Sequence, residues 1–494
     1  DGLGLDSRDA VLTVTWNLTD RLMLRSITGA TEIDSQSFVD FDSTEFQQFV
    51  DDNFDREKEF SQELHLTGDN FDGRVNWLVG GYYRKTKLRD RNYRWTMPEF
   101  YVPTGGLTAR CLELPCQAPN PAMVNYVRAW GLANDPASCL DNDPSTNPPG
   151  ANCMFNFSPL NLYTDTQGGG EDVDRALFGE VNVGVTDRLS AIVGVRFTQH
   201  DGREFVITPT SGFRPYEPRG PIVGDVFAGT IAQTVHDPKL ATISTPRFAL
   251  QYELDADRMV YFSYSEGFTA GAINIVEVIG EVVLEPEVLA TKELGLRSDW
   301  FDGMLRYNGT LFHSRWTGLR VNNRVPDPNN PGLILPFAYQ TSTGVAEVSG
   351  TEHELMYAPN ESWRVNASLA SLDTEYINVG DPAVSPVRIG DTFAYAPELS
   401  YSIGVTRFWS LATGAQLTVR ADYGWKDKYQ KDSAPIRQTI DGEAAYGLLN
   451  ARVVYEFPDR DWRLSFWGKN LTDERYDSGG VKASGRACAS SMIP

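Results

Sequence analysis

Basic and aromatic side chains occupy alternate positions in several extended segments, and this spacing could bind a small anion. Alternate residues of an extended chain point to one face, so these side chains share a face with other polar groups. Arginine and lysine could hold an anionic ligand by charge-assisted hydrogen bonds, while aromatic rings stack on it. The candidates are Arg74, Tyr82, Arg84, Arg196, Arg420 and Lys426 on polar faces, with Tyr93 and Trp95 in an expected loop.

The same residues also have a structural interpretation. Glu180 and Asp422 lie on polar faces of the same kind, so the arginines could pair with acids of neighbouring segments instead of a ligand. Loop aromatics such as Tyr93 could pack the loop itself. The sequence leaves both interpretations open.

Sequence signatures of catalysis are missing from the chain. It has no GxSxG, HExxH, GxGxxG or phosphate-loop motif. We therefore predict that the chain is not an enzyme and expect no cofactor. We also expect no metal site, because the histidines are scattered over separate segments, at His65, His200, His236, His313 and His353.

Four cysteines, Cys111, Cys116, Cys139 and Cys153, fall within one polar stretch. This stretch has no CxxC pair and no histidine, which disfavours a zinc site. Two disulfide bonds in a loop of an exported protein are the favoured interpretation, with reduced thiols in a cytosolic loop as the alternative. Local pairing, 111 with 116 and 139 with 153, is our prediction, although spacing alone does not fix the connectivity.

Composition narrows the class of protein further. The chain of 494 residues has a formal net charge of −22, and nucleic acid is excluded as a partner because phosphate binding needs a basic surface. Aromatic residues make up 12% of the chain, which suits a surface between lipid and water. No run of about 18 apolar residues occurs, so a transmembrane helix is excluded.

A period of two residues runs through almost the whole chain. In LFGEVNVGVTDRLSAIVGVRFTQH, which begins at Leu177, apolar residues alternate with polar ones on both sides of a short break at 186–188. We count roughly 16 such segments, many of about 10 to 14 residues, which is enough for a tilted strand to cross a bilayer. The pattern predicts an all-β protein with one apolar and one polar face per strand.

The connections between these segments alternate in length. Short turns at 255–257 and 301–303 contrast with long polar loops at about 91–172 and 203–240. Short turns at one end and long loops at the other are typical of an antiparallel transmembrane barrel, in which every backbone group pairs with a neighbouring strand. Aromatic residues near strand ends would then form interfacial belts, as expected for Trp16, Trp425 and Trp462; a soluble sandwich would bury them.

Six segments, in order along the chain, resemble successive landmarks of the TonB-dependent outer-membrane receptors. The pair YSEGFTAGAIN and GKNLTDERYD is the most specific of them. The segments are FSQELHLTGDNFDGRVNWLVGGYYR, DRALFGEVNVGVTDRLSAIVGVRFT, MVYFSYSEGFTAGAIN, LEPEVLATKELGLRSDWFDGMLRYNGTLFHSRWTGLRV, VSGTEHELMYAP and SFWGKNLTDERYD.

The resemblance implies a barrel of about 22 strands with a plug domain inside it. It also implies a place in the outer membrane of a Gram-negative bacterium, in contact with lipid, and uptake of an iron–siderophore complex or a similar scarce nutrient. The energy would come from TonB through the plug. The polar-face arginines could then also have plug residues as partners.

The sequence departs from the family pattern at both ends. We expect a partial barrel domain over 1–477 without the plug, then an irregular tail over 478–494 that lacks a terminal aromatic strand. A fragment or a frameshifted reading would explain both departures. Because strands would be missing, we expect an incomplete barrel in which residues near 12 do not pair with residues near 464.

Two other functions compete with the receptor interpretation. A passive outer-membrane porin needs no plug, although the family landmarks and the loop cysteines argue against it. A soluble β-rich domain that binds or hydrolyses carbohydrate would fold without detergent. The sequence does not identify the ligand in any of these cases.

Overall fold

The structure is a computed structural model. It describes residues 2–40, 50–97, 160–215, 223–225, 234–236, 241–276, 280–327, 330–431, 442–458 and 461–476. The four loop cysteines and the expected tail at 478–494 lie outside these residues, so their predicted pairing and irregularity remain predictions.

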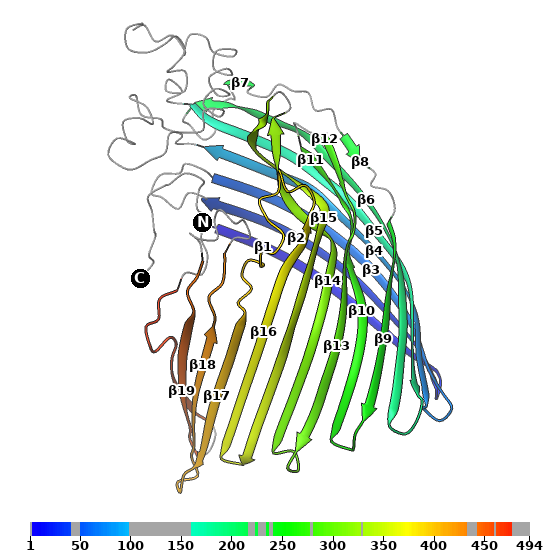
Figure 1. The fold of residues 1–494 in the computed structure, drawn as a ribbon, viewed down its shortest axis with the longest axis vertical. Helices are drawn as coiled ribbons and strands as arrows, with labels where there is room; N and C mark the ends of the chain where they lie inside the picture. Colours follow the sequence, from blue (N-terminus) through cyan, green and yellow to red (C-terminus); the bar gives the residue numbers. More distant parts are fainter. Residues whose placement is uncertain are drawn as a thin grey trace.

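Sixteen strands form one antiparallel sheet in which neighbours along the chain are neighbours in space (Figure 1). This count confirms the roughly 16 segments expected from the sequence. The strands are β1 (Gly2–Thr19), β2 (Leu22–Asp40), β3 (Val50–Asn70), β4 (Val75–Met97), β5 (Leu160–Gly184), β6 (Leu189–Pro215), β9 (Ala241–Glu253), β10 (Arg258–Thr269), β13 (Glu287–Trp300), β14 (Leu305–Asp327), β15 (Asn330–Asn360), β16 (Trp363–Val379), β17 (Leu399–Ser410), β18 (Gln416–Lys426), β19 (Tyr446–Glu456) and β20 (Arg463–Gly468).

Four short strands accompany the main sheet. β7 (Val223–Asp225) and β8 (Thr234–His236) both pair with β6. β11 (Ala272–Val276) and β12 (Gly280–Leu284) form a separate hairpin. The described residues contain no helix that is long and apolar enough to cross a membrane.

Several strands are longer than the alternating pattern indicates. β5 has 25 residues and β15 has 31. Because β4 extends to Met97 and β5 begins at Leu160, the loop expected from 91 to 172 is shortened at both ends. A strand needs an apolar face only over the about 9–11 residues that cross the hydrocarbon. Beyond that depth both faces meet water, and the alternation disappears while the hydrogen-bond ladder continues.

The two faces of the sheet differ as the pattern predicts. One face, called here the apolar face, carries large hydrophobic side chains that remain accessible: Leu177 is 70% exposed, Val193 58% and Ile403 43%. So large an exposed apolar surface needs a non-aqueous medium, and a bilayer supplies it. The opposite face, called the polar face, therefore faces the lumen that the wall surrounds.

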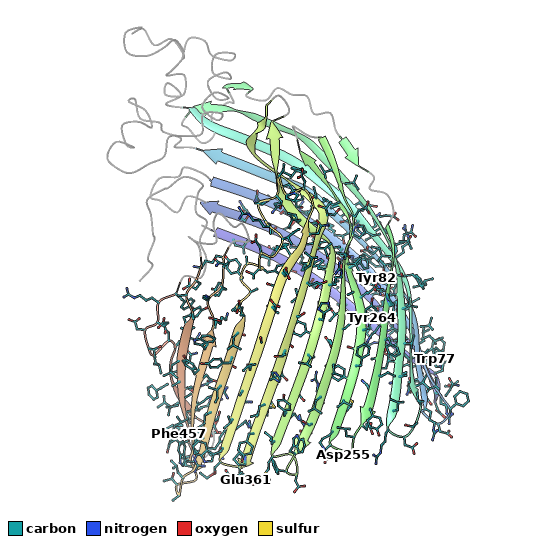
Figure 2. The ribbon with its side chains drawn as sticks, in the orientation of Figure 1. Trp77, Tyr82, Asp255, Tyr264, Glu361 and Phe457 are labelled. Atoms are coloured by element: carbon teal, nitrogen blue, oxygen red, sulfur yellow. The ribbon has the colours of Figure 1, made fainter. Side chains whose placement is uncertain are left out.

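The short turns all lie at one end of the wall. Figure 2 shows Asp255 and Glu361 together at this end, which we call the short-turn end. Two of these turns have the same sequence, FDG, at 71–73 and 301–303, and in both of them all three residues have positive φ. Glycine and aspartate tolerate this left-handed geometry best, so the repeated FDG gives two equivalent tight turns.

The first and last strands leave the wall open. β1 pairs with β2, so that Leu12 lies opposite Thr28, and β20 pairs with β19, so that Leu464 lies opposite Tyr455. Within the described residues no pairing joins β1 to β20. The expectation that residues near 12 would not pair with residues near 464 is confirmed.

Adjacent positions on β17 test which face meets lipid. Ile403 on the apolar face and Ser402 on the polar face are both exposed, so arginine fits sterically at either position. We expect Ile403→Arg to destabilise the protein in phospholipid vesicles by about 2 to 4 kcal/mol, as for a cation near the bilayer midplane, and Ser402→Arg by about 0 to 1 kcal/mol. Urea unfolding monitored by tryptophan fluorescence measures both; equal losses would contradict the assignment of the faces.

Candidate ligand-binding site

A cluster of charged and aromatic side chains lies on the polar face where β3, β4, β5 and β6 run side by side. The short connection between β5 and β6 fixes their register, which places Asp174 opposite His200. Arg84 on β4 lies opposite Asp174, and Ser61 on β3 lies opposite Arg84. Strand pairing thus lines up residues from four segments in one row across the wall.

Asp174 is the centre of the charged part of this cluster. Arg84 donates from Nε and Nη2 to Asp174 Oδ2, at 2.8 and 2.5 Å. The other oxygen, Oδ1, lies 2.7 Å from His200 Nδ1. Asp174 itself is buried, so both of its oxygens are satisfied by neighbouring strands instead of by water.

Further acids surround this row. Glu59 on β3 lies 3.7 Å from Arg84 Nη1 and accepts a hydrogen bond from Thr86 at 3.1 Å. Asp172 lies 3.9 Å from His200 Nε2. Arg84 therefore faces two carboxylates, and its charge is balanced within the wall.

Arg196 has a different environment. Its guanidinium carbon lies 5.1 Å from the ring centroids of both Tyr82 and Phe178, and its Nε donates to Thr198 Oγ1 at 3.2 Å. Stacking on aromatic rings holds a guanidinium without neutralising it. Among the described residues no carboxylate lies within 4.0 Å of Arg196, so its charge is available to a ligand.

A glycine makes room for the aromatic floor under Arg196. Gly80 on β4 lies directly opposite Phe178 on β5. A Cβ at Gly80 would come within 2.4 Å of the Phe178 ring and 2.8 Å of a backbone oxygen, so the ring can lie flat only over glycine. Together Tyr82, Phe178 and Arg196 form a surface that could hold the anionic, planar group of a small molecule.

The remaining sequence candidates lie elsewhere. Arg74 is in the turn after β3, where it forms an exposed pair with Asp187, and is not on the inner wall as its sequence position suggested. Arg420 on β18 donates to both oxygens of Asp422, at 2.8 and 2.5 Å. Lys426 ends β18, so these two residues belong to a distant part of the sheet.

Tyr93 and Trp95 fall in the last part of β4. In the hydrogen-bond ladder Tyr93 lies opposite Thr166 and Trp95 opposite Thr164, so both are strand residues and not loop residues. The structure brings together Tyr82, Arg84 and Arg196, which are three of the eight candidates.

Sequence reasoning missed Asp174, Phe178 and His200 as members of the site. All three have the parity of the polar face, and His200 follows Arg196 in the same alternating run. The missing information was the register between strands, which decides which polar residues lie opposite each other.

Three histidines outside the cluster each have a hydrogen-bond partner of their own. His65 bonds to Glu63 at 2.6 Å, His313 to Ser349 at 2.9 Å and His353 to Tyr307 at 2.8 Å. No group of three potential metal ligands is present in the part of the chain that the structure describes.

The apolar belt, the polar inner wall and the sorted turns together define the wall of a transmembrane β-barrel. Residues 2–471 match the family described as TonB dependent receptor-like, beta-barrel. The chain belongs to this family. The resemblance seen in the six sequence segments is thereby confirmed. Members of this family are outer-membrane proteins of Gram-negative bacteria and are not enzymes.

Curated relatives share part of this wall. The chain is 25% identical over 236 residues to the ferric-pyoverdine M114 receptor PbuA of Pseudomonas sp. (strain M114), covering 47% of this chain and 26% of the relative. It is 28% identical over 153 residues to the ferric-pyoverdine 358 receptor of Pseudomonas putida, covering 31% and 18%. The aligned part is thus about a quarter or less of these relatives' length.

Solved structures have the same fold. The ferric yersiniabactin uptake receptor FyuA from Yersinia pestis superposes with a TM-score of 0.67 at 15% identity, covering 98% of this chain and 58% of that one. The siderophore receptor PiuA from Acinetobacter baumannii gives 0.64 at 15% identity, covering 96% and 61%. The chain therefore spans less than two thirds of the receptors it superposes on.

Two arginine–aspartate pairs on the polar face allow a matched test of the cluster. Asp174 is buried and has two partners, whereas Asp422 has a side chain 40% exposed. We expect Asp174→Asn to lower the free energy of unfolding by about 1 to 2 kcal/mol and Asp422→Asn by less than about 1 kcal/mol. Urea unfolding in detergent micelles tests this; a larger loss for Asp422→Asn would show that the row does not stabilise the wall.

Proposed function

We infer that the chain is the barrel wall of an outer-membrane receptor that takes up an anionic iron–siderophore complex or a similar scarce nutrient. The observation that carries this proposal is Arg196, an unneutralised cation held over an aromatic floor on the inner wall. Arg84 and Arg420, two other arginines of the polar face, have carboxylate partners within the protein. Arg196 is thus the cation of the cluster whose charge an anionic ligand can balance.

The chemistry of the ligand class agrees with this surface. Catecholate, hydroxamate and carboxylate groups bind ferric ion through oxygens, and many of the resulting complexes are anionic. A guanidinium donates to such oxygens, and rings such as Tyr82 stack on the planar chelating groups. The two curated relatives are named as receptors for ferric-pyoverdine, an iron complex of this general kind.

The partners follow from the family and belong to the proposal. Lipid of the outer membrane contacts the apolar face, and TonB would act through a plug domain that would occupy the lumen beside the polar face. The polar-face cluster then faces the space through which the ligand travels. A passive porin would need no energised partner and no selective site.

A binding experiment tests the role of Arg196. The purified chain in detergent micelles is titrated with ferric complexes of a catecholate, a hydroxamate and a carboxylate siderophore, and quenching of tryptophan fluorescence is measured. We expect Arg196→Ala to weaken binding of the best ligand about tenfold, because a hydrogen bond to a charged group is lost. Arg247→Gln is the matched control, since Arg247 already pairs with Glu180 at 3.1 Å and should change affinity less than about twofold.

Two results would contradict the proposal. One is the absence of quenching by all three complexes, and the other is equal binding by the wild type and Arg196→Ala. Uptake of radioactive iron by cells that express this wall joined to a plug domain, with and without TonB, separates the receptor from the porin. Uptake that is independent of TonB would favour the porin.

A further inference from the structure

Another cation with no carboxylate partner among the described residues lies on the opposite side of the wall, on the apolar face. Arg407 on β17 lies opposite Trp363 on β16 and Val419 on β18. Its guanidinium carbon is 4.7 Å from the ring centroid of Trp363 and 5.3 Å from that of Trp409. A charged group among lipid-facing residues is costly unless something outside the protein balances it.

The neighbours of Arg407 on this face are apolar. Val419 lies opposite it on β18, and Val365 and Leu417 are diagonal neighbours that lie opposite Val405 and Trp409. Among the described residues no carboxylate lies within 4.0 Å of the Arg407 guanidinium, and the side chain is half-buried between its two tryptophans. The protein therefore holds this guanidinium in place and provides no counter-charge.

The depth of Arg407 identifies the surroundings. Trp363 is the first residue of β16, and Trp409 comes just before the end of β17. Figure 2 places Glu361, two residues before Trp363, at the short-turn end. Tryptophan at a strand end marks the level of the lipid headgroups, where the polar group closest to a lipid-facing arginine is a phosphate.

We propose that Arg407, between Trp363 and Trp409, binds the headgroup phosphate of an anionic glycerophospholipid in the leaflet at the short-turn end. The guanidinium donates two hydrogen bonds to phosphate oxygens, as its planar fork favours. The two indoles keep the side chain extended along the wall and cover the lipid glycerol region. A headgroup without an ammonium, such as phosphatidylglycerol, leaves the phosphate free of an internal competitor.

A second arginine–tryptophan pair supplies an internal comparison. Arg258, the first residue of β10, shares the apolar face with Phe262, and its guanidinium carbon lies 4.5 Å from the Trp300 ring. Unlike Arg407, it donates from Nε to Asp255 Oδ2 at 2.6 Å. This hydrogen bond holds the pKa of Asp255 below its usual value, so Arg258 is neutralised by the protein. Among the described residues, Arg258 thus packs against tryptophan with an internal counter-charge and Arg407 without one.

Native mass spectrometry of the purified chain tests the lipid site. The protein in detergent micelles is titrated with phosphatidylglycerol or phosphatidylcholine, and the bound lipids are counted. We expect the wild type to retain one phosphatidylglycerol with about tenfold preference over phosphatidylcholine, and Arg407→Gln to lose that lipid and the preference. Inorganic phosphate at millimolar concentration should not displace it, because a free anion lacks the acyl chains.

Two further variants keep the test decisive. Asp255→Asn removes the counter-charge of Arg258 and should create a second retained phosphatidylglycerol, a gain that a misfolded protein would not show. Arg407→Lys keeps the charge and should retain partial preference. Equal counts of phosphatidylglycerol for the wild type and Arg407→Gln, with both folded by heat-modifiability on gels, would overturn the proposal. Displacement by inorganic phosphate alone would do the same.

Discussion

The structure depends on one constraint: backbone N–H and C=O groups surrounded by hydrocarbon have no water to bond, so neighbouring strands must supply every partner. The sixteen-strand ladder meets this requirement along both edges of every strand from β2 to β19, and along one edge of β1 and β20. Once the ladder is fixed, the two-residue period assigns every side chain to lipid or to the lumen. The candidate ligand site and the proposed lipid site rest on which charges remain unbalanced on each face.

Several arginines of the polar face are balanced by carboxylates, either on another strand or on their own strand. Arg84 meets Asp174, Arg247 meets Glu180, and Arg420 meets Asp422. Such pairs keep the wall rigid and give little attraction to a passing ligand, because the protein already satisfies its own cations. Arg196 departs from this rule, and its aromatic support positions it without removing its charge.

Parity alone was enough to predict the faces of Tyr82, Arg84, Arg196 and Arg420, because a strand has only two sides. It failed for Arg74, which follows the left-handed FDG turn at 71–73 and belongs to that turn. Tyr93 and Trp95 were expected in a loop because the apolar alternation stops before them. They are strand residues because the ladder continues beyond the hydrocarbon, where no apolar face is needed. The pairing of Asp174 with His200 requires the register, which becomes visible only when β5 and β6 are placed side by side.

Arg196 and Arg407, two arginines with no carboxylate within 4.0 Å among the described residues, differ in what their surroundings can supply. Arg196 faces the lumen, where water solvates a guanidinium at little cost, so the site can stand empty and remain stable until a ligand arrives. Arg407 faces the bilayer, where no such solvent exists below the headgroups, so its place is restricted to the strand end beside Trp363. A lipid-facing cation at midplane depth would destabilise the wall, whereas at the headgroup level a phosphate balances it. The position of each arginine along its strand is therefore set by the polarity of the medium on its own side of the sheet.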